Sequence, residues 1–382
     1  MSPRQVLTWL AWVNTADAAS AHGVLTTKSW LRKDAHPRTE GGRVGFPLTH
    51  APPLEELVMA CADILPLPHL EEATVELHPP AVPHATLAHA VQRWMEEHEI
   101  NPALGLLEQL PKKWERLGEL VLLPHGTFSQ PDWTSVNNHQ QVQTLYKAIA
   151  ESLGGRSLAL QAPIANDGYR SAQTVLLHGS TEVQFRDHDV VYAFDAGRVM
   201  WSSGNVTERR RIGQLDLTGE TVVDAYAGVG YYTLQMLVNG GAKHVHACEW
   251  NPPSIEGLRT SAALNGVEHR LTVHEGDNAP SLAKLEGVAD RVHLGLLPSS
   301  EGAWKAAIKC LSDEGGWLHV HMNVEENRLE EWTKATVERL NEMAATSNRP
   351  WMFVPKHLER VKWFSPRVRH VVLDVSTAAK VD

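Results

Sequence analysis

Polar and glycine residues in the C-terminal half of the chain are spaced as the parts of a nucleoside-binding site would be. Asp224 ends an apolar run and precedes the loop AYAGVG, whose Gly228 and Gly230 allow the backbone to approach a ligand closely. Glu249 ends the next apolar run, 19 residues after Gly230. In dinucleotide-binding folds an acid at this spacing accepts hydrogen bonds from the ribose hydroxyls. These residues therefore predict a site for a nucleoside.

A third polar group narrows the choice of ligand. Asp277 and Asn278 follow another apolar run, where they could read the edge of an adenine. NAD and S-adenosylmethionine both contain adenosine and both fit such a site. The dinucleotide fingerprint requires GxGxxG, but Gly230 is followed by Tyr231 and Tyr232 with no third glycine. The sequence therefore favours S-adenosylmethionine over NAD.

The elements that must position these residues alternate regularly from about residue 206 onward. Helices are predicted at 229–242, 252–266, 302–316 and 327–345. Strands are predicted at 221–228, 243–250, 270–277, 290–298, 317–324, 351–364 and 370–376. This alternation predicts an α/β, Rossmann-like fold of the S-adenosylmethionine-dependent transferase type, a mostly parallel sheet with helices on both faces. Ligands of such sheets bind at the carboxyl ends of the strands.

Two further regions precede this domain. Residues 1–108 contain turn clusters and one amphipathic helix, which predicts an α/β N-terminal region of unknown role. Residues 109–205 contain short apolar runs between turn signals, which predicts a smaller β-rich domain that docks RNA. Residues 206–382 form the predicted catalytic domain.

Composition limits the class of protein. The chain has 382 residues, three cysteines and a formal net charge of −10. The cysteines lack the spacing of metal ligands, so we expect no metal and a reducing, cytoplasmic compartment. No stretch approaches the roughly 20 apolar residues of a membrane span. The negative charge gives no general attraction for nucleic acid, so RNA contacts must come from local basic patches. No stable protein partner is predicted.

Longer motifs add a family resemblance. The segments MWSSGNVTERRR, DAYAGVGYYTL, HACEWNP, DRVHLGLLPSSEGAW and GGWLHVHMNVE resemble the tRNA wybutosine-synthesizing protein 2 family. These enzymes are aminocarboxypropyltransferases related in fold to the tRNA guanine-N1 methyltransferases. The resemblance runs from about Leu110 to Val375 and is weaker over the first hundred residues.

The resemblance implies a reaction and cofactor contacts. The family's cofactor-binding positions fall on five residues here, namely Ser202, Arg209, Glu249, Asp277 and Asn278. The family usually has lysine where this chain has Arg209, which keeps the charge and could hold the methionyl carboxylate. The implied reaction transfers the 3-amino-3-carboxypropyl group of S-adenosylmethionine to the carbon-7 side-chain position of 4-demethylwyosine. That tricyclic base is at position 37 of phenylalanine tRNA, and methylthioadenosine is released.

Candidate RNA contacts combine cations with aromatic side chains. Basic residues interleaved with Trp363 and Phe364 suit the binding of a single-stranded loop through phosphate contacts and stacking. Enzymes that methylate base amines commonly have Asp or Asn before Pro-Pro and an aromatic residue at this strand end. Here Leu296 and Leu297 precede Pro298, and Ser299 and Ser300 follow it. Pro298 and Ser299 are further candidates for substrate contact. The predicted basic contacts are Arg210, Arg211, Lys362 and Arg367. No general base is identified, so the catalytic residues are unknown.

Other residues have simpler interpretations. Trp250 and Trp304 are interpreted as packing residues, and Tyr231 and Tyr232 as residues on a helix face. His319 and His321 are spaced to share a strand face and are interpreted as core or surface histidines.

Two other functions stay open. A tRNA guanine-N1 methyltransferase would share the fold, the cofactor and the RNA. A noncatalytic RNA-binding protein would have no affinity for the cofactor.

Overall fold

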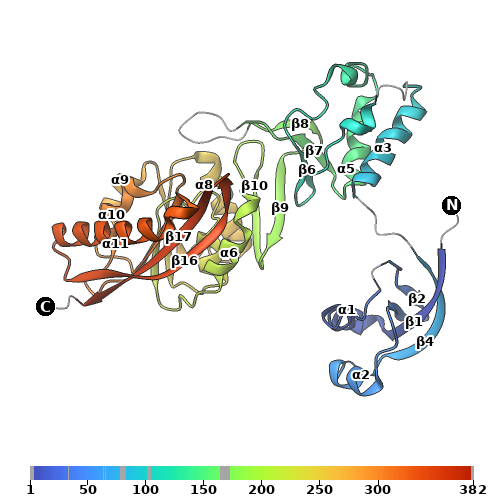
Figure 1. Ribbon diagram of the computed structural model, residues 1–382, viewed down its shortest axis with the longest axis horizontal. Coiled ribbons are helices and arrows are strands. Elements are labelled where there is room, and N and C mark those ends of the chain that lie inside the picture. The colour runs from blue at the N-terminus through green and yellow to red at the C-terminus, as the bar shows by residue number, and fades with distance from the viewer. Residues whose placement is uncertain are drawn as a thin grey trace. The chain divides into compact units, whose positions relative to one another are not determined.

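The computed structural model describes residues 4–32, 34–62, 64, 66–77, 83–100, 105–163 and 173–379. They form two compact units, Met1–Thr86 and Leu87–Asp382, and each is considered by itself (Figure 1). Within the described residues, no helix is both long enough and apolar enough to cross a membrane.

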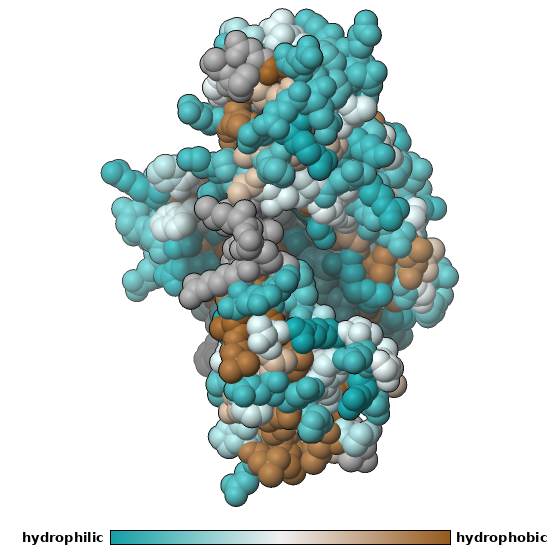
Figure 2. Space-filling view, turned by 90° about the vertical axis from the view of Figure 1, so that its right-hand side faces the viewer, coloured by the Kyte–Doolittle hydropathy of each residue, from teal (hydrophilic) through white to brown (hydrophobic). Residues whose placement is uncertain are grey.

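The first unit is a four-stranded antiparallel sheet with two helices, α1 (Ala18–Thr27) and α2 (Leu54–Ala60). The strands lie in the order β2 (Arg38–Glu40), β3 (Arg43–Leu48), β1 (Arg4–Asn14) and β4 (His69–Leu77). The helices bury Leu25 and Leu57 against Phe46 of the sheet. Apolar surface remains on α2, where Leu54 and Met59 are 73% and 80% exposed. Figure 2 shows apolar side chains gathered at the lower end of its view.

The boundary between the units falls within the first turns of a helix whose apolar residues belong to the core of the second unit. Helix α3 (Pro83–Glu97) packs Val91 and Trp94 with Leu145 and Ile149 of α5 (Val142–Ser152). This packing is why the compact units divide ahead of residue 108, and the division into three domains stays a prediction. The core lies against strands in the order β5 (Glu115–Leu117), β6 (Leu120–Leu123), β7 (Ser157–Leu160) and β8 (Val175–His178). Strands β9 (Glu182–Asp187) and β10 (Val190–Asp195) form a hairpin beyond it.

A seven-stranded sheet forms the centre of the C-terminal part. The parallel strands lie in the order β13 (Leu271–Glu275), β12 (His244–Glu249), β11 (Thr221–Asp224), β14 (Arg291–Leu294) and β15 (Trp317–Glu325). The edge is completed by an antiparallel pair, β17 (Val368–Ala379) and β16 (Trp351–Ser365). The mostly parallel sheet is confirmed.

Helices cover both faces of this sheet, as predicted. On one face, Val223 and Val292 pack under α9 (Asn278–Ala283), α10 (Trp304–Cys310) and α11 (Leu329–Thr346). On the other face, Val222 and Val245 pack under α6 (Val206–Gly213), α7 (Thr233–Val238) and α8 (Pro252–Leu264). Because adjacent residues of a strand point to opposite faces, both layers bury apolar side chains of the same strands.

Candidate active site

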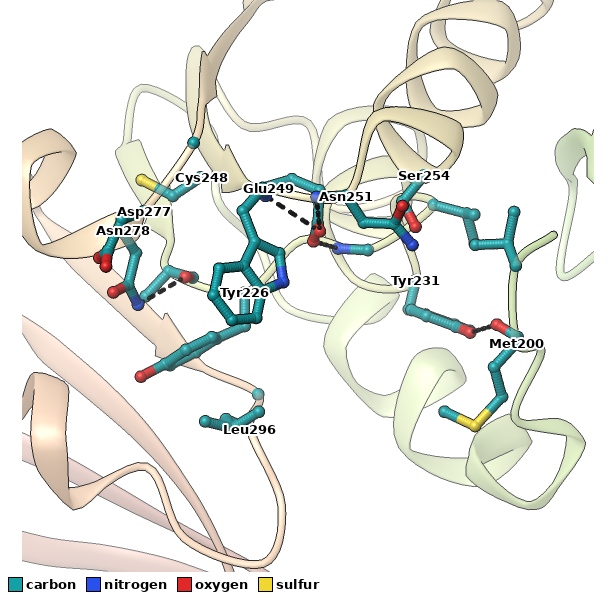
Figure 3. A pocket seen from close by; sticks show the side chains of 17 residues that line it. Met200, Tyr226, Tyr231, Cys248, Glu249, Asn251, Ser254, Asp277, Asn278 and Leu296 are labelled. Carbon is teal, nitrogen blue, oxygen red and sulfur yellow. Dashed lines mark hydrogen bonds between the residues drawn. The ribbon is translucent and has the colours of Figure 1, made fainter. Parts of the chain in front are cut away.

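A cavity of about 290 Å³ opens at the carboxyl ends of β11, β12, β13 and β14 (Figure 3). This is close to the lower end of the ~300–1,000 Å³ range of small-molecule pockets. The lining includes four residues predicted to bind cofactor, Gly228, Glu249, Asp277 and Asn278. The fold therefore brings together side chains from three consecutive strand ends.

Glu249 is held in one orientation by the backbone around it. Its Oε2 accepts a hydrogen bond from Gly228 N at 2.7 Å, and its Oε1 accepts from Trp250 N and Asn251 N at 3.0 and 2.8 Å (Figure 3). Burial raises the pKa of Glu249, and these hydrogen bonds lower it. A carboxylate has about four lone-pair sites, so roughly one is left for a ligand hydroxyl. A second ribose hydroxyl would have to displace a backbone N–H.

The two loop glycines have different roles. Gly228 has φ 57° and lines the cavity, and its N–H donates to Glu249. Gly230 has φ 91°, and a Cβ there would lie 2.7 Å from Leu258 and 2.8 Å from Leu234. Gly230 is outside the cavity lining, so close helix packing rather than ligand approach requires glycine there.

Asp224, predicted at the site, also lies outside the cavity lining. Its carboxylate is fully buried and accepts hydrogen bonds from Thr233 Oγ1 at 2.7 Å and Tyr226 N at 3.3 Å. These contacts attach the strand end to the start of α7. Asp224 therefore shapes the loop from behind.

Asp277 and Asn278 are both in the cavity lining, at the start of α9. Asp277 Oδ1 accepts from Ala279 N at 2.8 Å, so this side chain caps the helix. Asn278 Nδ2 donates to Ala225 O at 3.1 Å, which orients the amide beside the cavity (Figure 3).

Several lining residues were not predicted as site residues. Tyr226 and Trp250 line the cavity, and Trp250 is 45% exposed rather than packed in the core. Trp304 is buried, as its interpretation as a packing residue required. One feature of the sequence could have predicted that Trp250 lines the cavity: it directly follows Glu249, the acid at the strand end.

The tyrosine pair precedes α7 instead of lying on a helix face. Tyr231 lines the cavity, and its hydroxyl donates to Met200 O (Figure 3). Tyr232 is buried, with its ring centroid 4.3 Å from that of His293. The loop glycines delay the helix until Thr233, and this delay turns Tyr231 toward the ligand site.

Ser202 and Arg209 are outside the cavity lining, and Ser202 follows the lining residue Met200 by two positions. Arg209 is only 2% exposed, stacks 4.6 Å from the Trp201 ring centroid and pairs with Asp187 at 2.7 Å. Its Nη1 donates to Ser202 O at 2.9 Å. Arg209 therefore supports the segment that leads to the cavity-lining Met200.

The adjacent arginines differ in environment. Arg210 is exposed. Arg211 uses four of its five N–H groups on the carboxylates of Glu208 and Asp374, at 2.6 to 3.3 Å. A phosphate would have to compete with both carboxylates, so we do not carry Arg211 into the proposed RNA surface.

The other RNA candidates lie in two places. Pro298 and Ser299 follow the cavity-lining Leu296, and Pro298 O accepts from Asn323 N of β15 at 2.9 Å. Arg367 lies in the turn between β16 and β17, and Lys362 lies on β16. The RNA contacts of all four stay predictions.

Buried histidines cross the sheet behind the site. His321 Nδ1 lies 2.9 Å from His370 Nε2, and His321 Nε2 lies 3.1 Å from His293 Nε2. His293 Nδ1 lies 3.8 Å from Asp224 Oδ1. If all three rings are neutral, His370 can donate to His321 and His321 can donate to His293. The remaining N–H of His293 then points toward the Asp224 carboxylate. His319 and His321 are both buried on β15, and their ring centroids lie 5.8 and 4.7 Å from that of His293, as the predicted shared strand face requires.

Acid should destabilise the protein through these histidines. Burial lowers the pKa of His319 and His370 to about 4 and that of His321 well below its usual value. An unfolded histidine has a pKa near 6.5, so stability is full above about pH 6.5 and is lost as pH falls toward 4. We expect a loss of about 1–2 kcal/mol per histidine between pH 7 and 5, measured by urea unfolding.

A matched pair of variants isolates this effect. His370→Asn should make the loss with falling pH shallower, whereas the exposed His125→Asn should leave it unchanged. The raised pKa values of Glu208 and Glu249 act in the opposite sense, which is why the slopes of variants are compared. Equal slopes in all three proteins would contradict the assignment.

Comparisons with known proteins agree with this geometry. The model of the TRM5/TYW2 methyltransferase domain matches residues 183–349. The tRNA wybutosine-synthesizing protein 2 homolog of Danio rerio is 36% identical, over 76% of this chain and 78% of that protein. The tRNA wybutosine-synthesizing protein 2/3/4 of Arabidopsis thaliana is 43% identical over 71% of this chain. This chain spans only 26% of the length of that plant protein.

A solved structure is similar over a comparable share of the chain. P. horikoshii TYW2 in complex with MeSAdo has a TM-score of 0.60 and 25% identity, over 76% of this chain and 98% of that chain. The sheet order and the cavity at its strand ends define a protein with the S-adenosylmethionine-dependent transferase fold. Within this class, the chain belongs to the TRM5/TYW2 family, among the tRNA wybutosine-synthesizing protein 2 homologues.

Proposed function

We propose that this protein transfers the 3-amino-3-carboxypropyl group of S-adenosylmethionine to 4-demethylwyosine at position 37 of phenylalanine tRNA. The observation that carries the proposal is the 36% identity with the Danio rerio homologue across most of both chains. The cavity supports it, because Glu249 and Asn278 converge where a nucleoside would bind. The ligand of the P. horikoshii relative, MeSAdo, is methylthioadenosine, the by-product that the proposed reaction would release.

The residues of the cavity suit the adenosine part of the cofactor. The free lone-pair site on Glu249 can accept a ribose hydroxyl, and the rings of Tyr226 and Trp250 can cover the base. When bound, S-adenosylmethionine supplies an electrophilic Cγ, which bonds to the acceptor carbon as the Cγ–S bond breaks and sulfur keeps the electron pair. The acceptor carbon loses one proton to solvent. Orientation of the reactants can supply on the order of 7–11 kcal/mol of the rate acceleration.

The loop after β14 favours a carbon acceptor. Leu296, Leu297 and Pro298 stand where enzymes that methylate base amines commonly have an Asp or Asn. A carbon nucleophile on an electron-rich ring needs less base assistance than an amine, so an apolar loop is compatible with the proposed reaction. This loop lines the cavity through Leu296.

The tip of the β16–β17 hairpin is the proposed tRNA surface. Trp363 and Phe364 are 53% and 57% exposed, and the Arg369 guanidinium lies 3.7 Å from the Trp363 ring centroid. Exposed aromatic rings beside cations can stack on unpaired bases and contact phosphates. Arg367 in the same turn adds a cation to this surface.

The reaction product tests the proposal. Incubation with S-adenosylmethionine and phenylalanine tRNA carrying the tricyclic precursor should yield methylthioadenosine and a nucleoside heavier by one aminocarboxypropyl group, both measured by mass spectrometry. S-adenosylhomocysteine and a methylated guanosine would instead identify a guanine-N1 methyltransferase. Absence of S-adenosylmethionine binding by calorimetry would indicate a noncatalytic RNA-binding protein.

A further inference from the structure

One half-buried lysine contacts Ser202, two residues after the cavity-lining Met200. Lys362 on β16 donates from Nζ to Ser202 Oγ at 3.1 Å. Among the residues that the structure describes, no carboxylate oxygen lies within 4.0 Å of this ammonium. Glu115 raises its pKa from beyond that distance, and Glu115 Oε1 accepts from Ser203 Oγ at 2.8 Å. A partly desolvated cation without an ion-pair partner is suited to bind an anion.

Lys362 is the cation of this cluster that has no ion-pair partner among the described residues. Burial lowers the pKa of Lys362, the nearby Arg209 lowers it further, and Glu115 raises it. Arg209 is itself neutralised by Asp187, at 2.7 Å. His370, opposite Lys362 in the strand pair, has its pKa lowered to about 4 by burial, so it adds no charge at neutral pH. Glu115 therefore offsets the Lys362 ammonium only from beyond ion-pair distance.

The segment 200–202 connects this lysine to the cofactor cavity. Met200 lines the cavity, and its carbonyl accepts from the hydroxyl of Tyr231, another lining residue. Two residues later, Ser202 contacts Lys362 through its hydroxyl and Arg209 through its carbonyl. The backbone of this segment is thus held from both sides. Met200 lies on the opposite side of Glu249 from Asp277 and Asn278 (Figure 3).

We propose that Lys362, together with Ser202, binds the carboxylate of the methionyl group of S-adenosylmethionine and so holds that chain away from the adenosine. This inference rests on the proposed function. A carboxylate held there would expose Cγ, the carbon that the proposed reaction transfers. Lys362 acts beside Arg209, whose Nε and one Nη1 hydrogen are already engaged by Asp187 and Ser202. An RNA phosphate suits this position less well, because Lys362 is half-buried and faces the segment that lines the cavity.

Two ligands that differ in the carboxylate test the proposal. Calorimetry with the full chain should show that Lys362→Gln weakens S-adenosylmethionine binding by about tenfold to a hundredfold, the effect of losing a hydrogen bond to a charged group. Methylthioadenosine lacks the carboxylate, so its affinity should stay unchanged, which also shows that the variant is folded. Lys362→Arg should restore most of the S-adenosylmethionine affinity. The matched control is Lys356→Gln, an exposed lysine of the same strand, which should bind both ligands normally.

Three outcomes separate the alternatives. Equal weakening of both ligands in Lys362→Gln would overturn the proposal in favour of a structural role. Unchanged affinity for S-adenosylmethionine with weaker tRNA binding would overturn it in favour of a phosphate contact. Failure of the wild-type protein to bind S-adenosylmethionine, or to form methylthioadenosine, would instead reject the proposed function.

Discussion

Glu249→Ala is expected to weaken S-adenosylmethionine binding by at least about a hundredfold while tRNA binding is retained. The change removes a charged acceptor for ribose, and each hydrogen bond to a charged group contributes about 1.5–3 kcal/mol. It also removes the acceptor for Gly228 N, Trp250 N and Asn251 N. The backbone around the cavity therefore loses the hydrogen bonds that hold its conformation. Calorimetry with the cofactor and a filter-binding assay with tRNA measure the two affinities.

The matched control for this variant lies one strand away. Glu275 ends β13, and its exposed carboxylate pairs with Arg259 at 2.7 Å. Glu275→Ala should leave cofactor affinity unchanged, because this ion pair is outside the cavity lining. Cofactor affinity in Glu249→Ala equal to that of Glu275→Ala would refute the assignment of Glu249.

Arg211→Met is expected to lower the free energy of unfolding by about 3–5 kcal/mol, the usual cost of leaving a buried charge without its partner. Glu208 has no exposed surface, and Asp374 is 4% exposed. Arg211 bridges them with Nη2 2.7 Å from Glu208 Oε1 and Nη1 2.6 Å from Asp374 Oδ2. Urea unfolding at pH 7 measures the change.

Two comparisons show whether the loss comes from the buried charges. The control is Arg93→Met, which breaks the exposed ion pair between Arg93 and Glu97 on one helix. Its free energy of unfolding should equal that of the wild type. Replacing Glu208 as well, in Arg211→Met/Glu208→Met, should recover part of the loss, because one unpaired carboxylate is gone. A single-variant loss below about 1 kcal/mol would contradict the importance of this network.

Local sequence patterns were sufficient to locate the strand ends of the site. The apolar runs that end at Asp224 and Glu249 are strands β11 and β12, and Pro252 starts the helix that follows. Strand and helix periods are encoded in neighbouring residues, so a single sequence reports them. The direction of each side chain was not encoded in this way. Asp224 and Gly230 lie behind the cavity, whereas Tyr231 and Trp250 line it.

The sequence by itself determined the fold class, the strands of the main sheet along the chain, and the edge of that sheet where a nucleoside would bind. It did not predict the short helices α6 and α9. Only the tertiary structure decided which basic side chains form ion pairs inside the protein and which can still bind a ligand. Arg211 meets Asp374 163 residues away, and Lys362 meets Ser202 160 residues away. The physical reason is that the antiparallel β16–β17 pair joins the sheet beside β15, and such long-range pairing leaves no periodic signal in the residues themselves.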